Sequence, residues 1–178
     1  MKRILWALSL VLLLPALVSA QASEQPKGQA YVYFAPGVEG GRGGQYHLLK
    51  GLRDGTSRIG TAQIGGGGEF LIVKGLGLGL DLGYLAAWEH FAEGLAVISP
   101  DVSYHFLPRE GKGKVVPFVT AGYTCFFQAG GQSGANVGAG MHYWFKDHVG
   151  LRFEVRDNMM LGGGTLHEVG FRIGLALR

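Results

Sequence analysis

The sequence is poor in cysteine, in proline and in charge. Its 178 residues include one cysteine, six prolines and 16% charged side chains, whereas 47% are hydrophobic. The lone Cys125 excludes an internal disulfide, and low charge with high hydrophobicity excludes a disordered polar chain. The 32 glycines show no Gly-X-Y period, which excludes collagen, and their number argues against a helical bundle. What remains is one domain of glycine-rich β structure, a membrane protein, or both.

A long apolar run occurs only at the start of the chain. Lys2 and Arg3 precede an apolar stretch over residues 4–18, and small residues follow it. This order is typical of a secretory signal peptide, and an uncleaved membrane anchor is the alternative. We expect a signal peptide over residues 1–22, cleaved after Ala20 or Ala22, and one domain over residues 23–178. No later segment has the roughly 18 to 20 continuous apolar residues of a spanning helix, so a helical membrane protein is excluded.

Apolar residues alternate with polar ones at a period of two through most of the chain. From Val149 to Val155 every second residue is apolar, and Gly150, Arg152 and Glu154 lie between them. A helix would spread these charges around its circumference, whereas a strand places them on one face. The pattern predicts eight strands, at about residues 29–39, 59–73, 78–88, 96–106, 115–127, 136–145, 149–156 and 168–178.

The connections fall into two kinds that alternate along the chain. One end has segments 74–77, 108–114 and 146–148, and the other has 40–58, 90–94, 128–134 and 158–166. Short turns at one end and longer loops at the other are typical of outer-membrane barrels. Aromatic residues form two interfacial belts: Trp88, Phe91, Tyr123 and Phe127 near the loops, and Tyr104, Phe106, Tyr143 and Phe145 near the turns. The sequence therefore predicts an all-β fold, an eight-stranded antiparallel up-and-down transmembrane β-barrel.

Three segments carry a family resemblance: VPFVTAGY at 116–123, GAGMHYWF at 138–145 and GLRFEVRD at 150–157. They resemble the small eight-stranded outer-membrane β-barrels, the group that contains the OmpA membrane domain and OmpX, and the resemblance runs from about Gly28 to Arg178. It implies a Gram-negative-type outer membrane, contact with outer-membrane lipid and lipopolysaccharide, and assembly by the barrel-assembly machinery.

Seven charged residues share the inward parity of the strands. Because an unpaired charge in a desolvated interior costs several kcal/mol, we expect them to pair inside the barrel. Arg152, Glu154, Arg156 and Arg172 come from the last two strands, which adjoin, so we expect these four residues to form a linked network. We interpret the set as a structural plug of the lumen, and a narrow gated path for ions or water is the alternative. The residues are Glu69, Asp81, Asp101, Arg152, Glu154, Arg156 and Arg172.

Signals of catalysis and of bound cofactors are weak. Ser103, His105 and Asp101 share one strand face, which makes a barrel enzyme that deacylates or acylates lipid A the main alternative function. The His-x-Ser-Asn sequence associated with the deacylases is absent, and we expect no enzyme. The glycines at 65–68 and 75–79 lack the spacing of phosphate loops, and the six histidines lack ligand spacing, so that no cofactor and no metal is expected.

The first long loop is basic, with Arg42, Lys50, Arg53 and Arg58 against Asp54. Such a loop can contact lipopolysaccharide phosphates or an anionic partner, and a solvated loop is the alternative. Without Lys2 and Arg3 the 16 Lys and Arg fall to 14 against 13 Asp and Glu, so no nucleic-acid partner is expected. We expect a role in envelope integrity or in surface interaction with an extracellular protein or ligand through the loops. A soluble lipocalin-like barrel would need the reverse parity, apolar inside and polar outside.

Overall fold

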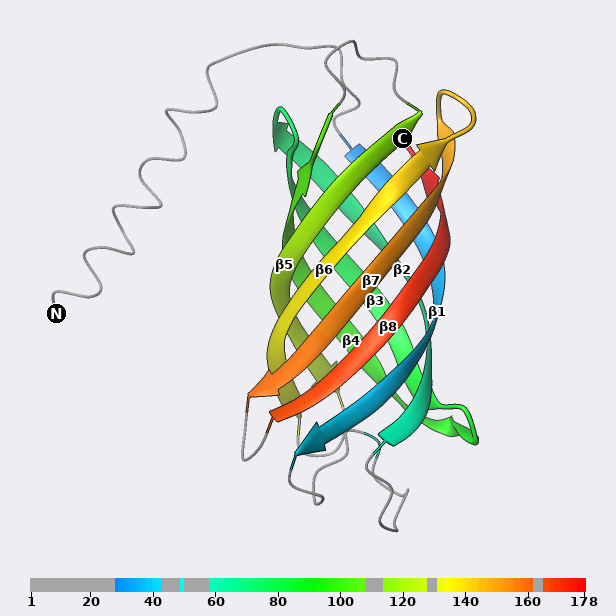
Figure 1. Ribbon diagram of the computed structural model, residues 1–178, viewed down its shortest axis with the longest axis vertical. Coiled ribbons are helices and arrows are strands. Elements are labelled where there is room, and N and C mark those ends of the chain that lie inside the picture. Colours follow the sequence, from blue (N-terminus) through cyan, green and yellow to red (C-terminus); the bar gives the residue numbers. More distant parts are fainter. Residues whose placement is uncertain (1–27, 43–48, 50–57, 108–113, 128–130, 162–164) are drawn as a thin grey trace, which may run out of the picture.

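Eight strands make up nearly all of the described chain. The computed structural model describes residues 28–42, 49, 58–107, 114–127, 131–161 and 165–178. Each strand pairs antiparallel with the next, and β8 pairs with β1, which closes the barrel (Figure 1). The strands are β1 Gly28–Arg42, β2 Arg58–Val73, β3 Leu76–Ala87, β4 His90–His105, β5 Val115–Phe127, β6 Gln132–Trp144, β7 Val149–Leu161 and β8 Thr165–Leu177.

The closed antiparallel barrel confirms the predicted fold class. In Figure 1 the loop end lies at the bottom, where the arrowheads of β1 and β7 point, and the turn end lies at the top. No helix among the described residues is long and apolar enough to cross a membrane.

The loop-end connections are shorter than the sequence predicted. The predicted loop at 90–94 was wrong, because β4 begins at His90 and Ala87 pairs with it, which leaves Trp88 and Glu89 as the connection. Residues 132–134 and 158–161 likewise belong to β6 and β7. The physical reason is that inward residues near this end are apolar, as with Leu95 and Met160. An alternation of polar and apolar residues therefore cannot mark the strands there.

The wall of the barrel is apolar outside and polar within along most of its length. On β7, Val155 is 51% exposed, whereas its neighbour Glu154 is 1% exposed. Leu80, Val119 and Ile173, on other strands, also point outward and are exposed. This is the opposite of a soluble barrel and matches a lipid-facing wall.

A run of glycines in β2 makes room for two tyrosines of β1. A side chain at Gly67 would start 2.8 Å from ring carbons of Tyr31, and one at Gly65 would start 2.7 Å from the hydroxyl of Tyr33. Tyr31 pairs with Gly67 and Tyr33 with Gly65 across the two strands. The glycine run therefore serves packing inside the barrel rather than a phosphate loop.

Candidate functional site

The interior of the barrel holds a cluster of ionised side chains around Arg156 of β7. Its Nη1 lies 2.7 Å from Asp81 Oδ2 on β3, and its Nη2 lies 3.1 Å from Asp101 Oδ2 on β4. Its Nε donates to Glu154 Oε1 at 2.5 Å. One guanidinium thus contacts three carboxylates from three strands, in the fork geometry that suits arginine.

Arg172 of β8 and Arg152 of β7 extend this cluster in opposite directions. Arg172 Nη1 donates to Asp81 Oδ2 at 2.6 Å, toward the loop end. Arg152 donates to Glu154 Oε2 from Nη2 at 2.9 Å and from Nε at 3.1 Å, toward the turn end. Both guanidinium groups also lie on aromatic rings, Arg152 on Tyr31 at 4.1 Å and Arg172 on Tyr33 at 4.3 Å. These contacts add cation–π attraction to the ion pairs.

The positive and negative charges of the cluster are balanced. Three arginines meet three carboxylates, and each of these residues is buried. Tyr31 Oη donates to the second oxygen of Asp81 at 2.5 Å. A buried set of ions is tolerated when its charges are balanced and most of its polar atoms are hydrogen-bonded. Arg156 Nη2 and Asp101 Oδ2 form an ion pair without a hydrogen bond. The structure therefore brings six of the seven sequence-predicted residues into one network, here called the lumen charge network: Asp81, Asp101, Arg152, Glu154, Arg156 and Arg172.

Glu69, the seventh residue, lies in a separate group with a histidine and a serine. Its Oε1 is 2.7 Å from His105 Nε2, and its Oε2 accepts from Gln29 at 2.7 Å. Ser103 Oγ donates to the same Oε1. The carboxylate beside Ser103 and His105 is therefore Glu69 from β2 and not Asp101, which contacts Arg156 instead.

The geometry of Ser103, His105 and Glu69 differs from that of a catalytic triad. A triad uses one ring nitrogen for the serine and the other for the carboxylate. Here the same Nε2 contacts Glu69 at 2.7 Å and Ser103 at 3.3 Å. The serine also bonds to the carboxylate directly, and all three residues are buried. The group is arranged to satisfy Glu69 rather than to activate the serine.

Sequence reasoning missed a layer of hydroxyl and amide groups between the lumen charge network and the loop end. Glu168 accepts from Asn158 Nδ2 at 2.7 Å and from Thr61 Oγ1 at 3.1 Å. Thr124 Oγ1 donates to Asn158 Oδ1 at 3.0 Å and accepts from Asn136 Nδ2 at 2.9 Å. These residues all face the lumen, so the alternation that identified the inward charges could also have identified this layer.

Stacked rings line the interior at the turn end. His142 lies between Phe118 at 4.9 Å and Trp144 at 5.4 Å, measured between ring centroids, and His105 stacks on it at 5.5 Å. Arg178 places its guanidinium 4.2 Å from the Trp144 ring. Arg152 Nη1 lies 3.2 Å from His142 Nε2, which links these rings to the lumen charge network.

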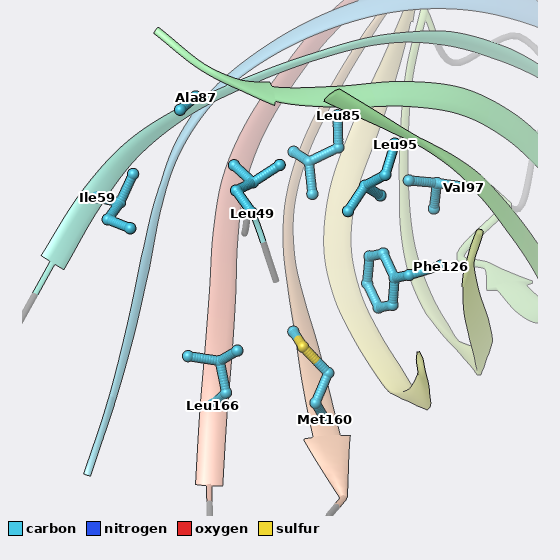
Figure 2. Close-up of a cluster of buried hydrophobic side chains, with 9 residues drawn as sticks. All are labelled: Leu49, Ile59, Leu85, Ala87, Leu95, Val97, Phe126, Met160 and Leu166. Atoms are coloured by element: carbon cyan, nitrogen blue, oxygen red, sulfur yellow. The ribbon is translucent and has the colours of Figure 1, made fainter. Parts of the chain in front are cut away.

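At the loop end the interior becomes apolar. Nine buried side chains form one cluster, shown in Figure 2. Leu49 belongs to the connection between β1 and β2, and it is 3% exposed against residues of the strand walls. The cluster comprises Leu49, Ile59, Leu85, Ala87, Leu95, Val97, Phe126, Met160 and Leu166.

The basic loop residues are only partly described. Lys50 and Arg53 lie outside the described residues, as does the side chain of Arg42 at the end of β1. Arg58 begins β2 and is exposed. In the described part of the chain no group of three or more His, Cys, Asp or Glu residues could hold a metal ion.

Solved structures of other proteins share this fold. Neisserial surface protein A superposes with a TM-score of 0.63 at 12% identity, covering 85% of this chain and 97% of that one. The N-terminal β-barrel domain of Pseudomonas aeruginosa OprF gives a TM-score of 0.51 at 17% identity, covering 83% of this chain and 97% of that one. No family model and no curated protein sequence matches. The chain thus has the fold of the small eight-stranded outer-membrane β-barrels, as its sequence resemblance implied.

Proposed function

We propose that this chain is an integral outer-membrane barrel with a filled, non-conducting lumen, which serves envelope integrity or surface interaction through its loops. The observation that carries the proposal is the lumen charge network, in which Arg156 joins β7 to β3 and β4 across the interior. An eight-stranded barrel is just wide enough for side chains to fill it. Exchange of these partners with passing ions is unfavourable, because breaking a buried ion pair costs free energy.

The layers on either side of the network support the same function. Toward the turns lie the stacked rings of Phe118, His142 and Trp144. Toward the loops lies the apolar cluster that includes Leu49 and Phe126. Apolar constrictions oppose the passage of water and ions. A gated pore would have to open the stacked rings, the charge network, the hydroxyl and amide layer and the apolar cluster together.

The outward surface supports membrane insertion. Exposed Leu80, Val119 and Ile173 face away from the lumen, and aromatic residues lie outward near both ends. Such a wall suits lipid and lipopolysaccharide, with delivery by a signal peptide and by the barrel-assembly machinery. Recovery of the protein from the membrane fraction, and not from the soluble periplasmic or extracellular fraction, tests this part of the proposal.

Conductance in planar bilayers tests the filled lumen. We expect the wild-type barrel to show no steady channel current. Arg152→Ala should leave conductance unchanged while lowering the free energy of unfolding, because Glu154 Oε2 loses both of its hydrogen bonds and His142 Nε2 loses its contact with Arg152. Steady channels in the wild type, or channels that appear in Arg152→Ala without loss of stability, would support the gated pore instead.

Enzymatic activity toward lipid A is the competing function. Ser103 and His105 are buried near the turn end, and both contact the same oxygen of Glu69, Oε1. This arrangement favours a structural role over catalysis. Mass spectrometry of lipid A from cells with and without the gene is the test. A gene-dependent loss or gain of an acyl chain would overturn the non-enzymatic assignment.

A further inference from the structure

The two ends of the barrel carry different exposed charges. At the turn end the exposed charged side chains of the described chain are Lys74, Lys114, Lys146 and Arg178, with Asp147 as the acidic one. At the loop end they are Arg58, Glu89 and Glu93. Among the described residues, exposed positive charge is therefore concentrated at the turn end.

Three of these cations are next in sequence to an outward aromatic residue or to a residue that lies against one. Lys74 precedes Gly75, whose Cβ position would be 3.4 Å from the ring of Tyr104. Lys114 precedes Val115, which pairs with Tyr143 of β6. Lys146 follows Phe145, which is exposed. Outward aromatics of this kind mark the boundary between hydrocarbon and headgroups, so these lysines stand at headgroup level.

Within the described part of the chain, the ammonium groups of these lysines have neither an ion pair nor a side-chain hydrogen bond. None of the ion pairs in the described part of the chain involves Lys74, Lys114 or Lys146. Arg178 differs, because it lies on Trp144 and donates to the Asp147 carbonyl at 2.8 Å. A lysine stem at a membrane boundary extends along the apolar surface and places its charge among headgroups.

We propose that Lys74, Lys114 and Lys146 form a lysine collar that binds the anionic headgroups of phospholipids in the leaflet at the turn end. The inference rests on the proposed membrane function and adds a ligand class to it. Phosphatidylglycerol and cardiolipin have the required charge, whereas phosphatidylethanolamine is neutral overall. The collar spans three different turns around the barrel, so it recruits several lipids of the surrounding shell rather than one lipid in a pocket.

The test compares which lipids the full chain retains. The protein, purified from membranes in a non-ionic detergent, is mixed with equal amounts of phosphatidylglycerol and phosphatidylethanolamine, and bound lipids are counted by native mass spectrometry. We expect the wild type to prefer phosphatidylglycerol. The triple variant Lys74→Gln, Lys114→Gln and Lys146→Gln should reduce that preference roughly tenfold or more, because each cation near an anionic surface favours binding about fivefold.

Two matched controls separate headgroup binding from changes in fold. Lys→Arg at the same three positions keeps the charge and should keep the preference. Arg58→Gln removes one exposed cation at the other end and should also keep it. Circular dichroism and the heat-dependent shift in gel mobility report whether each variant is a folded barrel, and all these exposed substitutions are expected to fold.

Equal retention of both lipids by the wild type, or an unchanged preference in the triple Gln variant, would overturn the collar. Failure of the proposed function would show elsewhere, as channel current or as recovery from the soluble fraction. The two failures are therefore distinguishable.

Discussion

Arg156 and Asp81 stand on opposite walls of the barrel and meet at 2.7 Å. Their strands, β7 and β3, are four apart in a closed ring of eight. Asp81 also accepts from Arg172 and from Tyr31, so one carboxylate holds together side chains of three other strands. The contact is a crossbar of the lumen, in the sense that it joins opposite walls, and its removal should lower the stability of the whole barrel.

Asp81→Asn should lower the free energy of unfolding by about 3–5 kcal/mol, because Arg156 and Arg172 lose a buried counter-charge. Urea unfolding of the barrel in lipid vesicles measures this. Glu89→Gln, at the exposed connection between β3 and β4, is the control and should change stability little. In the double variant Asp81→Asn, Arg156→Met the loss should be smaller than the sum of the two single losses. Additive losses would show that the two residues do not act as a pair.

Gly67→Ala should destabilise the barrel by roughly 1–3 kcal/mol, because the added methyl group would overlap the Asp81 carboxylate and the ring of Tyr31, which are hydrogen-bonded to each other. The adjacent Gly68→Ala is a matched control. It lies in the same strand but faces outward, and the nearest atom to its added methyl group is the Gln29 carbonyl oxygen at 3.8 Å. Equal effects at the two positions would contradict the packing of the tyrosines against the glycine run. The measurement is again unfolding by urea.

Leu49→Ala should cost about 2–5 kcal/mol if the loop-end cluster is packed as a core, since Leu49 is buried among strand residues. Leu80→Ala, on the outward wall, removes the same atoms from a lipid-exposed position and should cost less. Urea unfolding of the two variants measures the difference. Equal losses at the two positions would contradict a packed core at the loop end.

Val155→Arg should cost about 2–4 kcal/mol in a bilayer, because it places a charge on the lipid-facing wall. In a soluble barrel the same exposed position would accept arginine with little change. Glu93→Arg, exposed near the start of β4, is the control for a charge change outside the apolar band. Comparable stability of Val155→Arg and the wild type would argue against a lipid-facing surface at β7.

The sequence predicted the strands, the inward charges and a link among Arg152, Glu154, Arg156 and Arg172, but not the partners of Glu69, Asp81 and Asp101. Parity along β7 placed Arg152, Glu154 and Arg156 on one face without any knowledge of the register. The pairing of Asp101 with Arg156 and of Glu69 with His105 depends on how eight strands are staggered around a closed ring. Asp101, Ser103 and His105 are close neighbours along one strand, and the sequence suggested that they form one group. In the structure Asp101 contacts Arg156, whereas Ser103 and His105 contact Glu69.

The loop end was harder to predict for a different reason. Leu95, Val97 and Phe126 face inward, while Phe91 and Phe127 face outward, so that polar residues no longer mark one face. A two-residue connection at Trp88 and Glu89 also carries none of the usual glycine or proline signals of a turn. The role of Leu49 could not be read from local sequence, because its contacts come from several strands.

The same crossbar constrains the order of assembly. Hairpins β3–β4 and β7–β8 are each local in sequence, but Asp81 and Arg156 are 75 residues apart. A half-inserted chain containing only β5 to β8 would carry three arginines into lipid with Glu154 as their one carboxylate in the network. The three arginines are balanced only when Asp81 of β3 and Asp101 of β4 are also in place. We therefore expect insertion of these strands to be coupled to closure of the ring.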